Sequence, residues 1–214
     1  GHAAGDMVLI QMRDRLEKVF RESDYLVRWG GEEFLVVARA TSRTKAEQLA
    51  ERIRHTISGT PFALGGERYL SKTCSVGFTC FPFLPEHPGF MSWQQTVELA
   101  DHGLYTAKRS GRDAWVGLHG TESTVIEGGP EQLVASVTKT LESGGLRLSS
   151  SIPLPSLQLD SPAQACNELP SPCASHGDAN VLPNGHLDGL NPCERRTVGR
   201  AAHSLTVPLE VIKQ

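Results

Sequence analysis

The chain has 214 residues, of which 39% are hydrophobic and 21% are charged, and its formal net charge is −3 at pH 7. This length suffices for one well-packed core with an appendage. The slightly negative charge argues against a dedicated nucleic-acid binder. No apolar run is long enough to span a membrane, and the first residues lack the pattern of a secretory leader. We therefore expect no contact with nucleic acid or membrane. Because the first residue is Gly and not Met, we expect a piece of a longer protein.

Composition divides the chain into unequal parts. All 13 aromatic residues lie between Phe20 and Trp115, whereas nine of the 13 prolines follow residue 118. A segment without aromatic residues has little apolar surface to offset the entropy of ordering. The expected division is a domain at 1–118 that lacks its N-terminal part, a linker at 119–148 that could hold a short helix at 130–143, and a low-complexity, disordered tail at 149–214.

The first 60 residues predict a helix, a hairpin and a second helix. Apolar residues recur at helical spacing across 5–21 and again across 43–57, where Pro61 follows as a stop. Between these segments, 25–29 and 34–38 are rich in residues that favour strands. They flank a Gly-Gly pair, which is typical of a β-hairpin.

The next 60 residues predict a strand, a helix and a strand. Polar and apolar residues alternate across 72–80, a helical period covers 92–109, and a Ser-Gly-Arg-Asp turn precedes a last strand at 114–118. The order α-β-β-α-β-α-β indicates the α/β class. More specifically, it favours an α+β sandwich in which helices cover a mainly antiparallel sheet.

The five cysteines are scattered and form no CxxC pair. An odd number without paired spacing argues against a disulfide framework or a zinc site, and favours a reducing compartment. Cys74 lies in the alternating segment and is expected to be an ordinary buried strand residue.

The tip of the predicted hairpin is the most informative feature. Gly30 and Gly31 permit positive φ and a close approach of the backbone to a ligand, and Glu32 and Glu33 follow directly. Hard divalent cations prefer carboxylate oxygens, so this turn could bind a metal or a metal-bound phosphate. The alternative is a solvated turn with two incidental charges.

The surroundings of this turn favour the first interpretation. The heptapeptide Arg-Trp-Gly-Gly-Glu-Glu-Phe at 28–34 resembles the signature hairpin of the GGDEF family, the diguanylate cyclases. Four further segments resemble the family in the same order: GHAAGD at 1–6, RESD at 21–24, SVG at 75–77 and ADHGLYTAKRSGRD at 100–113.

The resemblance implies a palm-like fold, related to nucleotide cyclases and polymerases. It implies the condensation of two GTP molecules into cyclic di-GMP with release of pyrophosphate, a nucleotidyltransferase reaction of bacterial second-messenger signalling. It further implies Mg²⁺ or Mn²⁺ as cofactor, a homodimer as the catalytic unit, and a cytoplasmic domain of a longer sensor protein, which could be bound to a membrane.

The resemblance also implies roles for individual residues. Glu32 would be a metal ligand that helps to deprotonate the 3′-hydroxyl, and Glu33 would contact the nucleotide or a second metal, so both are candidate catalytic and metal-binding residues. Gly30 and Gly31 would let the phosphates approach the backbone.

Three further residues are candidate substrate ligands. Asp6 would accept hydrogen bonds from a guanine edge, although a charge near a helix N-terminus is an equally simple explanation. Lys108 and Arg112 would hold the terminal phosphates, although basic residues near a helix C-terminus also compensate the helix dipole.

A second ligand site is implied for the product. Arg21 and Asp24 would bind cyclic di-GMP, with Arg52 as a supporting cation, because arginine suits phosphate and aspartate suits guanine. The alternative is a local ion pair between Arg21 and Asp24 at the helix end.

The chain departs from the family at its start. The family has an earlier strand with a metal-binding Asp, followed by a Lys and a guanine-binding Asn, none of which can be assigned here. We therefore expect the sheet to lack its central strand and the metal site to lack one carboxylate, so that this segment alone could be inactive. The alternative function is an inactive module that binds cyclic di-GMP through Arg21 and Asp24.

Overall fold

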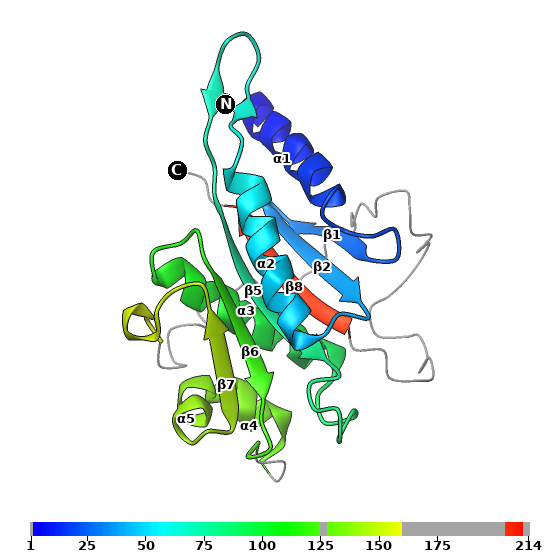
Figure 1. Cartoon of the computed structure of the whole chain (residues 1–214), viewed down its shortest axis with the longest axis vertical. Helices are drawn as coiled ribbons and strands as arrows, with labels where there is room; N and C mark the ends of the chain where they lie inside the picture. The colour runs from blue at the N-terminus through cyan, green and yellow to red at the C-terminus, as the bar shows by residue number, and fades with distance from the viewer. Residues whose placement is uncertain (1, 125–127, 160–203, 212–214) are drawn as a thin grey trace.

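The computed structural model describes residues 2–124, 128–159 and 204–211, which form a six-stranded sheet with helices on both faces and a small two-stranded sheet (Figure 1). Five of the six strand pairings are antiparallel, so the expected α+β class is confirmed. The elements up to residue 120 are α1 (His2–Glu17), β1 (Tyr25–Gly30), β2 (Glu33–Arg39), α2 (Arg43–Ser58), β3 (Phe62–Ala63), β4 (Tyr69–Leu70), β5 (Cys74–Phe81), α3 (Trp93–Arg109) and β6 (Trp115–Gly120).

The first helix is shorter at its C-terminal end than the pattern predicted. It ends at Glu17, whereas the apolar period continues to residue 21. The reason is a tight turn, because the N–H groups of Val19 and Phe20 both donate to the carbonyl of Leu16, at 2.8 and 3.3 Å. The predicted hairpin and the helices at α2 and α3 lie where the pattern placed them.

The centre of the large sheet is the main difference from expectation. The strand order is β1-β2-β8-β5-β6-β7, and β8 (Ser204–Val211) lies between β2 and β5, antiparallel to both (Figure 1, red). The expectation of a missing central strand is therefore wrong for this structure, as is the expectation of disorder at 204–211. Two open strand edges offer unpaired N–H and C=O groups to any extended segment.

The sequence of β8 contains a signal that supports this pairing. Leu205, Val207, Leu209 and Val211 alternate with other residues, which is the period of a strand. The register pairs Leu205, Val207 and Leu209 with Ala38, Val36 and Phe34, which are core residues of β2. Of the rest of the predicted tail, residues 160–203 and 212–214 lie outside the described residues, whereas 149–159 contain regular structure against the expectation of disorder.

The segment that follows β6 is packed onto the domain and is not an extended linker. It forms α4 (Gly129–Ala135), α5 (Val137–Glu142), β7 (Leu146–Ser150), which pairs with β6, and the 3₁₀ turn η1 (Leu154–Ser156). The single helix expected at 130–143 is thus two short helices, because Ser136 leaves the helical conformation at φ −136° and ψ 40°. Leu133, Val134 and Val137 are buried in a second apolar cluster with Phe83 and other residues.

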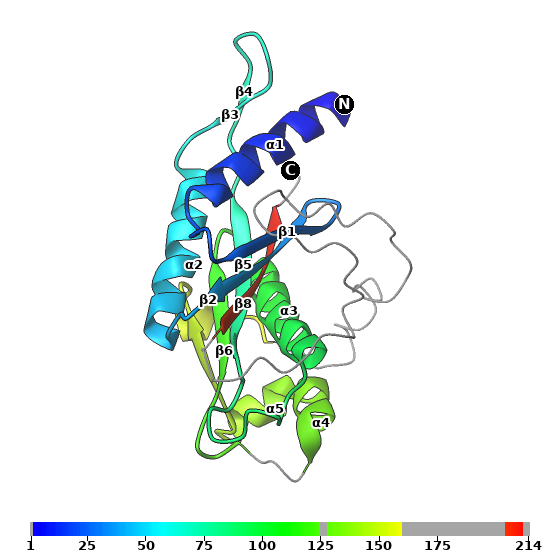
Figure 2. The same ribbon diagram turned by 90° about the vertical axis from the view of Figure 1, so that its right-hand side faces the viewer.

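The two faces of the sheet differ in what covers them. Helices α1 and α2 share a core with one face, whereas α3 lies on the opposite face (Figure 2). A Cβ atom at Gly77 of β5 would overlap the backbone of Ala100 and Leu104, so α3 rests directly on this strand. No helix of the described segments is long and apolar enough to cross a membrane. Cys74 is fully buried, as predicted.

The buried imidazole of His119 makes the fold sensitive to acid. His119 is 1% exposed, its Nε2 lies 3.1 Å from the Ser149 hydroxyl, and its ring meets the edge of Phe78. Burial, aided by the positive charges of Arg43 and Arg147, lowers its pKa to about 4. An unfolded histidine titrates near pH ~6.5, so the unfolded state binds the proton first as the pH falls. The stability that depends on the neutral ring is complete above pH ~6.5 and is lost on the way to about pH 4.

We expect the wild-type protein to lose about 2 kcal/mol of unfolding free energy relative to His119→Gln between about pH 6.5 and 5. Glutamine keeps a polar group near Ser149 but does not titrate. Urea unfolding of both proteins at several pH values measures the difference, and the comparison cancels the titration of other groups. Two curves that run parallel across this range would contradict the prediction.

Candidate functional site

The β1–β2 hairpin presents its tip as an open turn. Gly31 has φ 47°, a conformation that favours glycine, and a Cβ atom at Gly30 or Gly31 would meet nothing within 4 Å. The Arg28 guanidinium donates to the Gly31 carbonyl from Nε and Nη2, at 3.0 and 2.6 Å. The backbone of the turn is thus fixed from within, while Glu32 and Glu33 are both partly exposed. A ligand can approach the turn without displacing packed groups.

The C-terminal half of α3 faces this hairpin with two charged groups. Burial raises the pKa of Asp101 to about 7, and the negative charge of Glu33 adds to the increase. Burial lowers the pKa of Lys108, against the opposing effects of Glu33, Asp101 and Glu32. These mutual effects place the hairpin carboxylates and the Lys108 ammonium in one electrostatic neighbourhood.

Arg112 belongs to the same neighbourhood. It is exposed in the loop after α3, and its positive charge lowers the pKa of Lys108. Four of the residues predicted from the sequence, Glu32, Glu33, Lys108 and Arg112, are therefore brought together. Two carboxylates beside two cations can bind a metal-bound polyphosphate, since each part of such a ligand finds a group of opposite charge.

The donors present are compatible with magnesium, although they form no complete cage. Within the described residues, no group of three or more His, Cys, Asp or Glu side chains could hold a metal ion. Mg²⁺ is nevertheless commonly bound through one or two carboxylates plus substrate phosphates and water. The adjacent carboxylates of Glu32 and Glu33 fit that pattern. In the backbone register, β8 pairs residue Glu210 with Glu33 and with Ser75.

Asp6 is not joined to the hairpin by any hydrogen bond or ion pair that the described residues show. It lies exposed on the second turn of α1, so it is not an N-terminal cap. The N-terminal end of α1 and the tip of the hairpin point to the same side of the molecule (Figure 2). The structure thus leaves Asp6 exposed to solvent, and its contact with guanine stays a prediction.

The three predicted product-binding residues lie around the loop between α1 and β1. The Asp24 carboxylate accepts the backbone N–H of Arg21 at 3.0 Å and that of Arg39 at 2.9 Å. Arg52 donates from Nη2 to the Val19 carbonyl at 2.8 Å. Asp24 and Arg52 thus also stabilise the loop, and Asp24 binds the backbone of Arg21 instead of its guanidinium. Binding of the product at this loop remains a prediction.

Asp101 is a residue of this site that the sequence did not single out, although it belongs to the motif at 100–113. Asp101 precedes Lys108 by seven residues, which is close to two helical turns and places both on one face of α3. That spacing was the available signal. Its closeness to Glu33 depends on how α3 packs across the sheet, which no local pattern shows.

Comparisons with known proteins match the part of the chain that contains this site. A family model described as "Diguanylate cyclase, GGDEF domain" matches residues 1–114. Diguanylate cyclase DgcP of Pseudomonas aeruginosa is 45% identical over 113 residues, which is 53% of this chain and 16% of that protein. Response regulator PleD of Caulobacter vibrioides is 39% identical over 118 residues, 55% of this chain and 25% of that protein. Uncharacterized protein YhcK of Bacillus subtilis is 42% identical over 113 residues, 53% of this chain and 30% of that protein.

These matches cover less than a third of each relative, and no solved structure matches the chain. The family model covers more than half of the chain and includes the hairpin and the end of α3. The chain therefore belongs to the GGDEF family, a family of nucleotidyltransferase-type enzymes whose function is related to cyclic di-GMP.

Proposed function

We propose that this chain supplies the catalytic half-site of a diguanylate cyclase, which condenses two GTP molecules into cyclic di-GMP. In this reaction each 3′-hydroxyl attacks the α-phosphorus of the other GTP, a new P–O bond forms, and the bond to pyrophosphate breaks. The observation that supports the proposal most directly is the electrostatic coupling of Lys108 to Glu33, Glu32 and Arg112. It indicates that cations suited to bind phosphate and carboxylates suited to bind a metal lie together at one end of α3.

Each residue has a task that its surroundings suit. Lys108 is partly buried, so its interaction with a phosphate is screened less by water than that of a fully exposed lysine. Arg112 offers a planar fork that matches phosphate oxygens. Glu32 and Glu33 would hold Mg²⁺ or Mn²⁺, and a divalent cation supplies charge neutralisation on the reacting phosphates in such transfers. Asp6 would recognise the guanine edge.

The reaction requires two copies of the domain, because each copy presents one GTP. Both reacting ends must meet, so the hairpin tip and Arg112 need to face the partner, which agrees with their exposure. We therefore propose a homodimer as the catalytic unit, acting in the cytoplasm, where GTP is available.

Incubation of the purified chain with GTP and Mg²⁺ tests the proposal. We expect cyclic di-GMP and pyrophosphate, with a rate that rises faster than linearly with protein concentration because two copies must meet. Chromatography with mass detection identifies the product. Binding of cyclic di-GMP without any turnover of GTP would contradict the enzyme and favour the inactive binding module.

Replacing Arg21 by alanine should relieve product inhibition. Under the proposed function, the Arg21 guanidinium binds a phosphate of cyclic di-GMP, and loss of a hydrogen bond to a charged group weakens inhibition by about tenfold. The initial rate without product should change little. Titration of product against wild type and Arg21→Ala measures the inhibition constants.

Lys18→Ala is the matched control, because it removes an exposed cation from the same end of α1. Asp24 is a poor choice for this test, since its carboxylate accepts two backbone N–H groups. Equal inhibition of wild type and Arg21→Ala would show that this loop does not bind the product.

A further inference from the structure

The loop between α3 and β6 has a backbone conformation that side chains disfavour. Gly111, Arg112 and Asp113 have φ values of 109°, 62° and 45°. Glycine adopts this region readily, whereas for residues with a Cβ atom this conformation is sterically unfavourable. The Arg112 N–H donates to the Ala107 carbonyl at 3.1 Å, which closes the end of α3. Such a conformation persists only where its surroundings hold it in place.

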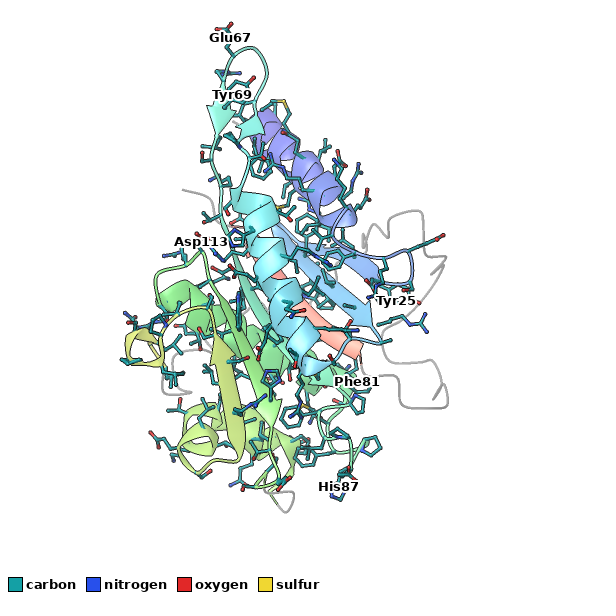
Figure 3. All side chains as sticks on the ribbon, viewed as in Figure 1. Tyr25, Glu67, Tyr69, Phe81, His87 and Asp113 are labelled. Carbon is teal, nitrogen blue, oxygen red and sulfur yellow. The ribbon has the colours of Figure 1, made fainter. Side chains whose placement is uncertain are left out.

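Side chains of helix α2 contact this loop and can hold its backbone in place. Arg54 Nη1 lies 3.1 Å from Asp113 Oδ1, and the Arg54 side chain is only 18% exposed (Asp113 is labelled in Figure 3). The same guanidinium donates to both carboxylate oxygens of Glu51, at 2.8 and 3.1 Å. Glu51 also accepts the indole N–H of Trp115 at 2.8 Å. Helix α2 therefore holds the chain on both sides of Ala114.

The charges in this network are strongly paired. Hydrogen bonding to Arg54 and Trp115 lowers the pKa of Glu51 to about 2, against the effect of burial. Hydrogen bonding to Glu51, supported by Asp113, raises the pKa of Arg54. Glu51 and Arg54 are therefore both ionised at neutral pH. The two hydrogen bonds to Glu51 fix the plane of the Arg54 guanidinium, and its ion pair with Asp113 then anchors the loop.

We propose that the Arg54–Asp113 ion pair positions Arg112 for the substrate phosphate, an inference that rests on the proposed function. Arg112 is the residue directly before Asp113, so its Cα moves whenever the Asp113 backbone moves. Without the anchor, the two side-chain-bearing residues leave the left-handed region. The guanidinium of Arg112 then no longer points to a fixed place beside Lys108. Arg54 acts through Arg112 and is a positioning residue.

A double-mutant cycle tests this proposal by GTP binding. Arg54→Met keeps the aliphatic length and removes the guanidinium. This substitution should weaken the binding of GTP by about tenfold in the wild-type background, and by less than about twofold when Arg112 is already alanine. Asparagine tolerates the left-handed conformation, so Asp113→Asn should weaken the binding of GTP less than Asp113→Ala does. Isothermal titration with Mg²⁺ and a GTP analogue that cannot release pyrophosphate gives all the dissociation constants without turnover.

The matched control is Arg13→Met, which removes an arginine that pairs with carboxylates on the surface of α1. It should leave GTP affinity unchanged. An equal effect of Arg54→Met in both backgrounds, or no effect in the wild type, would overturn the proposal, because Arg54 would then act through the general stability of the fold or not at all.

Amide hydrogen exchange provides a readout that does not depend on GTP. In Arg54→Met, exchange at residues 110–115 should become at least about tenfold faster, while exchange across α1 stays as in the wild type. Unchanged exchange at 110–115 would overturn the positioning role even if the variant lost activity. If the wild-type chain does not bind GTP, the proposed function fails, and hydrogen exchange still decides whether the ion pair holds the loop.

Discussion

Glu32→Gln should reduce the rate of cyclic di-GMP formation by a factor on the order of 10³ and leave the fold intact. The substitution keeps the shape of the side chain and removes one negative charge from the hairpin pair. That charge is needed most when the phosphates and the cation are in place together, so the loss falls on the reaction rate. The Glu32 side chain makes no hydrogen bond or ion pair within the described residues, so the midpoint of thermal unfolding should stay within about 2 °C.

Glu67→Gln is the matched control for this variant. Glu67 lies at the tip of the arm formed by β3 and β4, far from the β1–β2 hairpin (Figure 3). It undergoes the same chemical change, and its rate should equal that of the wild type. A wild-type rate in Glu32→Gln with Mg²⁺ supplied would contradict the assignment of this carboxylate to the reaction.

The sequence was sufficient to predict most of the domain, because its helices and strands are amphipathic on a local scale. The hairpin, α2 and α3 follow from periodicity, and Gly31 marks a turn that needs positive φ. Lys108 and the hairpin carboxylates were identified by residue type and motif, and the structure brings them together. In each case the information lies within a few residues of the feature that it predicts.

The features of the site that escaped prediction depend on contacts between distant segments. Asp101 lies close to Glu33 only because α3 packs across the sheet, and Asp24 meets the backbone of Arg39 only after β2 has folded beside β1. The Arg54–Asp113 pair joins α2 to a loop almost sixty residues later. A local sequence pattern carries no information about such long-range contacts, so these contacts could not be predicted.

The central strand is the clearest example of this limit. Residues 204–211 follow a long segment without aromatic residues and contain Pro208, which argues against a central strand in a local analysis. In the ladder to β5, no pairs are described opposite Gly77 and Phe78, where Pro208 and Val207 would stand. The ladder to β2 is continuous across the same residues. Strand β8 therefore occupies the centre of the sheet although its ladder to β5 is interrupted, because the backbone groups of both neighbouring strands need hydrogen-bond partners.

Removal of residues 204–214 should abolish cooperative unfolding of the domain. Strand β8 pairs with seven residues of β2 and six of β5, so its loss leaves two rows of backbone groups without partners at the centre of the sheet. Each buried group left unpaired costs about 1–3 kcal/mol, and a domain of this size is stable by only about 5–15 kcal/mol. Circular dichroism during urea unfolding should show a broad transition in place of a sigmoid one.

A second variant distinguishes the effect of losing strand β8 from the effect of shortening the chain. Replacing 204–211 by a Gly/Ser segment of equal length keeps the connection and removes the alternating pattern, so it should behave like the shortened chain. A synthetic peptide with the sequence of 204–211, added to the shortened chain, should restore part of the transition. Because β8 lies beside the end of β2 that contains Glu33, restored folding should be accompanied by restored binding of GTP. An unfolding midpoint equal to that of the wild type in both shortened and replaced chains would show that the sheet does not depend on β8.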